Sequence, residues 1–328
     1  LRTQHPNLIL LSGGGLLDDT SPLAKLKNQY IISGLILQKY DAIALQAKDL
    51  SFGISMLMQD SDALSLPWVA TNPYANEEAI NRHSEKNKTR IPSDKTITRG
   101  SITLRFFNSA NYQNQQGETI SLPKVVLIEQ LKAAKANGHF TILSVEEGDT
   151  SHHDLVGKSF LDILMTPMRD EYFKDPVRNG NTLILSPGNR GMSLGVIQLT
   201  VQAGKISDSF IHNITALDNA IENAPRMDTW YEDYNKAVEE QYQENAARRI
   251  KHADPVYASD QTCKTCHSKE HEIWSQTDHS KAFADLQKVS KAFDPACIGC
   301  HVVGFDDDGG FINEFHTPNL KNVQCESC

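Results

Sequence analysis

The chain has 328 residues, 39% of them hydrophobic and 22% charged, an ordinary globular composition with room for more than one domain. Its 32 Lys and Arg residues are outnumbered by 41 Asp and Glu residues, and the formal net charge is −9. An acidic chain is a poor candidate for binding nucleic acid or an anionic membrane surface, and no apolar run approaches the roughly 20 residues that span a bilayer. We therefore expect no nucleic-acid partner and no membrane span.

The two ends of the chain suggest that it is part of a longer product. It begins at Leu1 without an initiating Met or an apolar leader, and it stops at Cys328, the second Cys of a C-x-x-C pair. We expect a leader to have preceded Leu1 and more chain to follow Cys328.

The first part of the chain alternates apolar runs with a helical pattern. Apolar runs predict buried strands at 7–12, 42–45 and 66–70, and residues 21–39 carry apolar side chains at roughly helical spacing. A strand–helix–strand order predicts a right-handed crossover and a largely parallel sheet that is covered on both faces.

The next elements are less regular. Residues 75–98 are polar, which predicts a surface loop. Beyond them we expect three strands, at 101–107, 125–128 and 140–145, with a helix at 129–137 between the last two. A closing hairpin is expected from 181–186 and 194–201.

The composition changes after the last predicted strand. Residues 227–250 are dominated by Glu, Gln, Ala and Arg without Gly or Pro, which predicts a solvated helix that connects two domains. From about residue 256 the periodicity fades, and the aliphatic residues look too few for a core. We therefore expect something other than side chains to fill this region.

Cysteine spacing is the strongest motif in the sequence. All six cysteines follow residue 262 and form three C-x-x-C pairs: Cys263 and Cys266, Cys297 and Cys300, and Cys325 and Cys328. His267 and His301 directly follow the first two pairs. In C-x-x-C-H the two thiols add to the vinyl groups of one haem, and the adjacent His ligates the iron. The pattern predicts at least two covalent haem c groups and a total of three or more.

Three other interpretations of the cysteines are less favourable. A zinc ribbon uses C-x-x-C pairs but needs no His after the second Cys. With 12 His in 328 residues, two such placements by chance have odds of roughly one in 700. A disulfide framework is poorly served by C-x-x-C pairs, and a redox function would need one pair only. Haem attachment is the favoured interpretation.

The residue types that could supply the second axial ligand of each iron can be reduced by elimination. The last Met is Met227, so the haem segment offers no Met ligand. Each iron is therefore bound by two His or is five-coordinate, unless a residue from outside the segment serves. The candidate distal ligands are His252, His271, His279 and His316. Ligation by two His gives a lower potential than His and Met.

The C-terminal stretch resembles the multihaem c-type cytochromes, in particular the tetrahaem-cytochrome-like module. The resemblance is carried by all three motifs, by Trp274 with 279–283, and by 302–305, 309–311, 317–318 and 322–324. It implies that His279 is the distal ligand of a neighbouring haem and that the partners are redox proteins. It also implies a periplasmic or cell-surface location, because c-type haem is attached outside the bacterial cytoplasm. A homo-oligomer or a haem-chain assembly is left open.

The first 205 residues or so resemble calcineurin-type metallophosphoesterases of the 5′-nucleotidase kind, which implies a layered α/β sandwich. The resemblance is carried by residues 10–17, 40–53, 66–72 and 181–195. In that family the corresponding segments carry Asp-Ala-Gly-Asp, Gly-Asn-His-Glu, a strand that ends in Ala-Asn, and a hairpin with paired glycines.

The departures from that family concern its metal ligands. Gly15 replaces the bridging Asp, Ala47 and Lys48 replace the Asn and His, Val145 stands at a strand-end His, and 167–170 replace Gly-His-x-His. A two-metal site needs several anionic or imidazole ligands; Gly15, Ala47, Val145 and Met168 supply none, and Lys48 would add a cation. We therefore expect a degenerate domain with no catalytic residues and no phosphoesterase activity.

Three weaker patterns also occur. Gly13–Gly15 before a helix could cradle a phosphate, His152–Asp154 could bind a metal, and Asp306–Gly309 hints at calcium. None has the full spacing of its motif, so we expect solvated loops at the last two and no phosphate site at the first.

Together these patterns predict an α/β domain at 1–205, a connector with a long helix at 206–255, and a mostly α and irregular multihaem cytochrome domain at 256–328. The expected function is electron transfer, and the chain is an electron carrier rather than an enzyme. One alternative is a multihaem oxidoreductase acting on a small inorganic substrate at a five-coordinate haem. Another is an active nucleotidase with an attached cytochrome.

Overall fold

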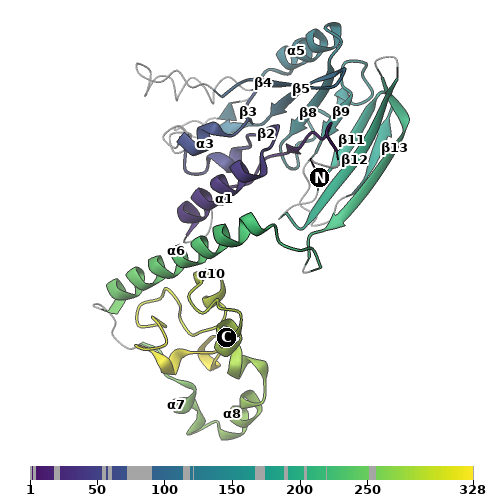
Figure 1. Cartoon of the computed structure of the whole chain (residues 1–328). Helices are drawn as coiled ribbons and strands as arrows, with labels where there is room; N and C mark the ends of the chain where they lie inside the picture. The colour runs from purple at the N-terminus through teal and green to yellow at the C-terminus, as the bar shows by residue number, and fades with distance from the viewer. Residues whose placement is uncertain are drawn as a thin grey trace, which may run out of the picture. The chain divides into compact units, whose positions relative to one another are not determined.

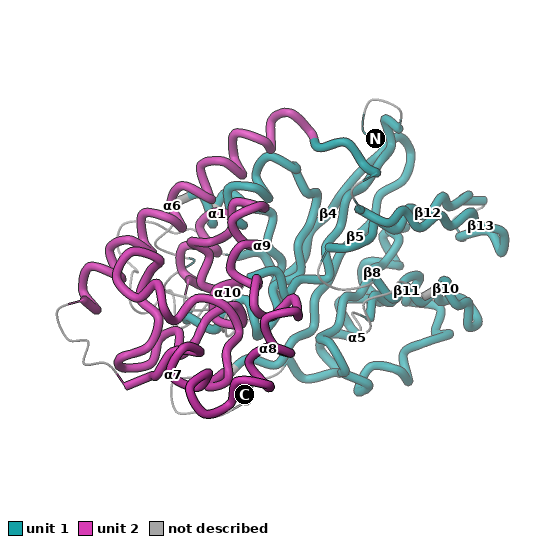
Figure 2. The backbone as a smooth tube through the Cα atoms, turned by 90° about the horizontal axis from the view of Figure 1, so that it is seen from below, with its two compact units in different colours: residues 1–19, 31–223 teal, residues 20–30, 224–328 magenta. Residues whose placement is uncertain are grey.

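The structure is a computed structural model that separates into two compact units (Figure 2). Unit 1 is Leu1–Asp19 with Ile31–Asn223, and unit 2 is Thr20–Tyr30 with Ala224–Cys328. No helix among the described residues is long and apolar enough to cross a membrane. The structure describes residues 2, 5–17, 23–53, 57, 61–71, 91–113, 119–120, 122–166, 174–187, 191–202, 205–218, 220–250 and 256–327.

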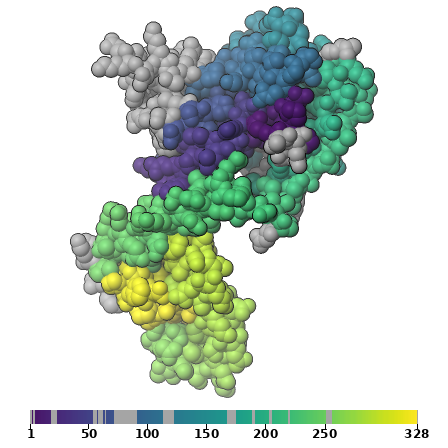
Figure 3. All heavy atoms as spheres, viewed as in Figure 1, coloured from purple at the N-terminus to yellow at the C-terminus, as the bar shows by residue number. Residues whose placement is uncertain are grey.

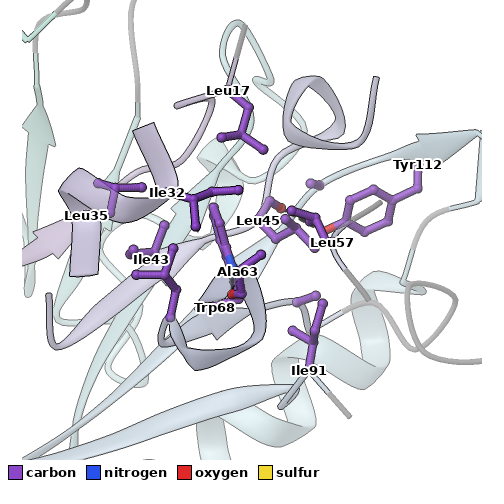
Figure 4. Packing of buried hydrophobic residues seen from close by; sticks show 13 residues of the cluster. Leu17, Ile32, Leu35, Ile43, Leu45, Leu57, Ala63, Trp68, Ile91 and Tyr112 are labelled. Atoms are coloured by element: carbon purple, nitrogen blue, oxygen red, sulfur yellow. Dashed lines mark hydrogen bonds between the residues drawn. The ribbon is translucent and has the colours of Figure 1, made fainter. Parts of the chain in front are cut away.

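The first sheet of unit 1 is short and parallel. Its order is β1 (Leu11–Ser12), β2 (Ala42–Ala44) and β3 (Trp68–Val69), as the strand–helix–strand pattern predicts (Figure 1). One face packs on α1 (Ala24–Gln38), where Ile32 and Leu35 contact a cluster built around Trp68 (Figure 4). The Trp68 indole donates to the Ala63 carbonyl at 2.9 Å, which ties the sheet to α3 (Ser61–Ser65).

The second sheet has the order β10-β11-β9-β8-β5-β4, with four parallel central strands and an antiparallel strand at each edge. These strands are β4 (Asp94–Arg99), β5 (Ile102–Ser109), β8 (Phe140–Val145), β9 (Ile163–Met165), β10 (Lys174–Asn179) and β11 (Thr182–Ser186). A separate short ribbon pairs β6 (Tyr112–Gln113) with β7 (Thr119–Ile120).

Side-chain alternation along β5 explains the layers around this sheet. Phe107 faces α5 (Lys124–Ala136) together with Leu127 and Leu131. Phe106 faces the opposite core, which also contains the first sheet and the hairpin of β12 (Ser193–Gln202) and β13 (Lys205–Ala216). Unit 1 is therefore the expected layered α/β sandwich, seen from two directions in Figures 1 and 2.

Two strand predictions in unit 1 are wrong. Residues 125–128 belong to α5, because only Leu127, Leu131 and Ala134 are buried, at helical spacing, while Val125 is 62% exposed. The segments 181–186 and 194–201 do not pair with each other: β11 lies between β10 and β9, and β12 pairs with β13.

The polar stretch 75–98 is only partly a loop. Its last part forms strand β4, and residues 72–90 lie outside the described residues. The strand pairing of unit 1 continues through β13 to Ala216, beyond residue 205.

The long helix of unit 2 is α6 (Pro225–Arg249). Pro225 and Asp228 in its first turn, and Arg248 and Arg249 in its last, suit the free backbone groups and the dipole of a helix. The prediction of a fully solvated helix is wrong in one respect. Val238, Tyr242 and Ala246 are buried and form a stripe at i, i+4 and i+8.

Unit 2 continues with short helices joined by irregular segments, as predicted, and residues 256–328 appear in light green to yellow in Figure 3. The helices are α7 (Asp260–Lys264), α8 (Ser268–Ser275), η4 (Asp278–Lys281), α9 (Ala282–Lys288), α10 (Pro295–Ile298), η5 (Pro318–Leu320) and η6 (Cys325–Ser327).

The expectation that this region lacks its own core is wrong. A cluster of buried side chains joins Tyr242 to Phe283, Leu286, Ile298, Val302, Val303, Phe311 and Leu320. The Tyr242 hydroxyl donates to the Ile312 carbonyl at 2.9 Å. These apolar residues have no regular period, so sequence periodicity could not show that they meet.

Candidate functional site

The second C-x-x-C-H motif is built on the short helix α10. The Asp294 side chain caps its N-terminus by accepting from the Ala296 N–H at 3.1 Å, and Pro295 starts it. The His301 N–H donates to the Ile298 carbonyl at 2.8 Å, so the helical turn continues through the motif. Two thiols and an imidazole therefore share one compact turn.

The His301 ring is held in a defined tautomer. Its Nδ1 lies 2.6 Å from the Ala282 carbonyl. A carbonyl can only accept, so Nδ1 carries a proton, and Nε2 carries the lone pair in the neutral ring. Histidines that bind a metal are usually oriented in this way by a backbone carbonyl or a carboxylate. The donor set of the motif, two thiols and an oriented imidazole, therefore fits a covalent haem.

The first motif lies on α7 and the turn after it. The Cys266 and His267 N–H groups both donate to the Cys263 carbonyl, at 3.2 and 2.9 Å. The sequence-predicted candidate His271 is buried, and its Nε2 lies 2.8 Å from an Asp260 carboxylate oxygen. One imidazole nitrogen of His271 is thus engaged with Asp260.

The third motif lies beside the first. The Gln324 side chain accepts from the Asp260 N–H at 2.8 Å and donates to the Asn319 and Lys321 carbonyls. Desolvation and then the neighbouring Cys325 thiol raise the pKa of Cys263, so the two thiols are close. Cys328 lies outside the described residues.

Trp274 and His279, predicted to belong to the haem site, meet the segment before the third motif. The Trp274 indole donates to the Val323 carbonyl at 2.8 Å, and the Val323 N–H donates to the His279 carbonyl at 3.2 Å. The backbone of His279 is therefore fixed to a residue that lies two positions before Cys325.

The candidate His316 is held by a residue that the sequence reasoning missed. Asn313 is 6% exposed, and its side-chain oxygen accepts from the Phe315 N–H, the His316 N–H and the His316 Nδ1 at 3.0, 2.9 and 2.9 Å. An Asn three residues before a His was the available signal. The last candidate, His252, lies outside the described residues.

The acidic loop Asp306–Gly309 is bound by side chains from elsewhere in unit 2. Arg249 contacts Asp306 Oδ1 at 3.5 Å and the Asp307 carbonyl at 3.1 Å, and the Tyr257 hydroxyl donates to Asp307 Oδ2 at 2.7 Å. Asp306, Asp307 and Asp308 are exposed, so the turn is solvated as predicted, and two of its carboxylates also have protein partners. The described residues contain no group of three or more His, Cys, Asp or Glu that could hold a metal ion.

In unit 1, the ends of several strands meet at one edge. Asp49, in η1 (Ala47–Leu50) after β2, is 4% exposed and accepts four backbone N–H groups. The donors are Gly15 and Gln46 to one oxygen at 2.9 Å each, and Leu16 and Leu17 to the other at 2.7 and 3.1 Å. Burial raises the pKa of Asp49, and these hydrogen bonds oppose the shift.

A second buried network joins the same strand ends. The Asn108 amide donates to the Leu45 and Val69 carbonyls, and the Tyr112 hydroxyl donates to the Leu45 carbonyl at 2.7 Å. The Gln46 amide donates to the Gly13 carbonyl at 2.6 Å and approaches the Val145 carbonyl at 3.4 Å. The polar side chains at this edge therefore form hydrogen bonds with backbone carbonyl groups.

His152 corrects another expectation, because it is buried rather than solvated. Its Nε2 lies 3.2 Å from Ser109 Oγ, and its Nδ1 lies 2.9 Å from Ser151 Oγ and 3.1 Å from Asp149 Oδ2. Burial favours a higher pKa for Asp149, but Ser151 and His152 outweigh it and lower the pKa. The network holds the loop after β8 against the end of β5.

Three of the segments aligned by sequence with metal ligands of the phosphoesterase family lie at this same edge. Gly15 follows β1, Ala47 and Lys48 begin η1, and Val145 ends β8 and is fully buried. The segment 167–170 lies outside the described residues.

Residues 262–328 match the cytochrome c554 and c-prime family. Cytochrome c-554 of Nitrosomonas europaea is 35% identical over 91 residues, which cover 23% of this chain and 39% of that protein. The chain thus spans well under half of this curated relative. The resemblance of the C-terminal region to multihaem c-type cytochromes is confirmed.

Solved structures confirm the fold of the rest. A 5′-nucleotidase precursor from Thermus thermophilus is similar with a TM-score of 0.57 and 13% identity, covering 72% of this chain and 51% of that one. The sulfate thiohydrolase SoxB from Thermus thermophilus is similar with a TM-score of 0.54 and 15% identity. The match covers 77% of this chain and 44% of that one. The calcineurin-like phosphoesterase YfkN from Bacillus subtilis is similar with a TM-score of 0.52 and 16% identity. The match covers 71% of this chain and 85% of that one. At these identities the likeness concerns the fold alone.

Proposed function

We propose that this chain transfers electrons as a multihaem c-type cytochrome and that its phosphoesterase-like domain has no phosphoesterase activity. The observation that carries the first part is the second motif, where two thiols share a turn with an imidazole whose Nδ1 is fixed by the Ala282 carbonyl. The match of residues 262–328 to the cytochrome c554 family supports it.

The roles of the residues follow from their chemistry. Haem c supplies an iron that cycles between two oxidation states. The six cysteines would hold the haems by thioether bonds, and His267 and His301 would bind the iron. Ligation by a second His would keep the potentials low. We propose redox proteins as partners and a periplasmic or cell-surface location.

The cofactor can be tested on the purified full chain. We expect the mass of the denatured polypeptide to exceed the sequence mass by a whole number of haems, at least two. Replacement of both Cys297 and Cys300 by Ser should remove one haem, whereas replacement of Thr262, which lies beside the first motif, by Ser should remove none. A polypeptide that carries no covalent porphyrin would refute the proposal.

The proposed loss of phosphoesterase activity has a separate physical basis. Gly15, Ala47 and Val145 offer no ligand atoms on their side chains, and Lys48 would bring a cation to a site for two dications. The buried Asp49 is already committed to four backbone N–H groups. The domain would then dock a partner or orient the haem array.

A phosphatase assay tests this point directly. We expect no hydrolysis of 5′-nucleotides or p-nitrophenyl phosphate above background with Mn²⁺ or Zn²⁺ added. Turnover that depends on the added metal, and that survives removal of the haem thiols, would show an active nucleotidase instead.

A further inference from the structure

The first and third motifs of unit 2 form one group, and His279 belongs to it. Gln324 bonds to Asp260 at the start of α7, and the thiols of Cys263 and Cys325 are neighbours. The His279 backbone is bonded to Val323, just before the third motif. His271 is paired with Asp260 in the same group. Within the described part of unit 2, the remaining histidine outside the motifs is His316.

That candidate, His316, lies on a loop whose two ends are attached directly after the second motif. The Phe311 N–H donates to the Val303 carbonyl and the Val303 N–H donates to the Leu320 carbonyl, both at 2.9 Å. Val302 also forms an isolated antiparallel bridge with Lys321. Because Val302 directly follows His301, the loop is anchored to the second motif.

The loop is itself rigid. The Ile312 N–H donates to Thr317 Oγ1 at 2.8 Å, the Thr317 N–H donates to the Asn313 carbonyl at 3.1 Å, and the Ile312 carbonyl accepts from Tyr242. The buried Asn313 oxygen then collects three donors from Phe315 and His316. The ring of His316 is therefore presented in one orientation.

The imidazole of His316 has the same electronic arrangement as that of His301. Its Nδ1 donates to an amide oxygen, whose identity is fixed by two further backbone donors, so Nε2 is the nitrogen that carries the lone pair in the neutral ring. The residue is exposed, and none of the hydrogen bonds described above for it involves Nε2. An oriented neutral imidazole with a free Nε2 is the form that binds iron.

We propose that His316 is the distal ligand of the haem attached through Cys297, Cys300 and His301, and that Asn313 positions it. This inference rests on the proposed function, because it presupposes a haem at the second motif. It makes that haem six-coordinate and closed to small ligands, which favours electron transfer over an oxidoreductase with an open iron.

The test uses the full chain with its haems. We compare wild type with His316→Ala, His316→Met and Phe315→Ala, a matched control because Phe315 is 80% exposed on the same loop. Haem content, CO binding to the reduced protein and the ferric spin state by electron paramagnetic resonance are measured for each.

We expect His316→Ala to keep its haem content, to bind one more CO per chain than wild type and to gain one high-spin ferric haem. His316→Met should remain low-spin at that haem and show the absorption band of a thioether–iron bond with a raised potential. Phe315→Ala should match wild type.

Each opposing result has a distinct meaning. If His316→Ala keeps its haems and binds no additional CO, the assignment of His316 is wrong while the cytochrome proposal stands. If His316→Ala loses a haem, His316→Met decides, since a high-spin haem without the thioether band there would also refute the assignment. A wild-type chain without covalent haem refutes the proposed function itself.

Discussion

Asp49 shows how a single buried carboxylate can organise the edge of a sheet. It accepts four backbone N–H groups that come from the loop after β1 and from the start of η1. Backbone N–H groups left without a partner in a buried position cost free energy, so the carboxylate and the loop depend on each other. The carboxylate of Asp49 therefore has a structural role at this edge.

Replacement of Asp49 by Asn tests this role. The amide would turn one acceptor into a donor that faces two N–H groups, so we expect a loss of about 2–4 kcal/mol in the free energy of unfolding. Asp175→Asn is the control, because that side chain is 96% exposed and should cost less than about 0.5 kcal/mol. Equal denaturant midpoints for the two variants would contradict the interpretation.

Tyr242 gives unit 2 a dependence on alkaline pH. Desolvation raises the pKa of Tyr242 to about 12, whereas an unfolded tyrosine titrates near 10. Because the folded pKa is the higher one, the stabilisation is fully present below pH 10 and is lost as pH rises from 10 to about 12.

We therefore expect Tyr242→Phe to be less stable than wild type by about 1 kcal/mol at neutral pH, because it loses the bond to the Ile312 carbonyl. The difference should shrink or reverse between pH 10 and about 12. Urea unfolding at several pH values measures this. A difference that stays constant with pH would show that Tyr242 does not carry the effect.

At the scale of elements, the loop after the second motif depends on the absence of side chains. Gly304 has φ +63°, and a Cβ there would lie 2.4 Å from the Tyr257 ring. A Cβ on Gly310 would lie 1.8 Å from the Gly304 carbonyl oxygen. The turn is therefore packed backbone against backbone.

Gly310→Ala should destabilise unit 2 by about 3 kcal/mol or more, since the backbone of the turn must move. Gly148→Ala is the control. That residue has φ +77° and a Cβ there would have no atom within 4 Å, so only the strain of a positive φ, about 1 kcal/mol, is expected. If the two variants have equal thermal unfolding midpoints, the close approach at Gly310 does not contribute to stability.

The predictable and the unpredictable elements differ in how local their signals are. The helices α1 and α6 and the strands β2 and β8 follow from periodicity within their own segments. The pairing of β11 does not follow from its own segment, because its neighbours β9 and β10 come from other parts of the chain. Pro176 in β10 fits the position of that strand at the edge of the sheet. The haem motifs are likewise local, whereas the Ala282 carbonyl that orients His301 lies 19 residues away and only folding reveals it.

At the scale of the whole molecule, negative charge should govern encounters with electron donors. The full chain carries a net charge of −9, and residues 256–328 hold six Lys against eleven Asp and Glu, a net charge of −5. A negative potential attracts cations and repels anions over distances that shrink as salt is added.

We expect the rate constant for reduction by hexaammineruthenium(II) to fall as ionic strength rises from about 0.01 M to about 1 M. Reduction by dithionite, an anion, should show the opposite trend. Stopped-flow measurements at the haem absorption band compare the two, and the same salt trend for both reductants would rule out electrostatic steering.

Unit 2 recruits a piece of chain from near the N-terminus, with practical consequences for dissecting the protein. The Trp230 indole donates to the Tyr30 carbonyl at 3.1 Å, the Tyr30 hydroxyl donates to the Asp233 carbonyl at 3.0 Å, and the Tyr30 ring meets Trp230 and Tyr234 edge-on. A gene fragment that starts at residue 224 would encode the three cysteine motifs but would lack Tyr30 and its contacts with α6. Such a fragment should be prone to aggregate through α6, and supplying residues 20–30 as a separate peptide should improve its solubility.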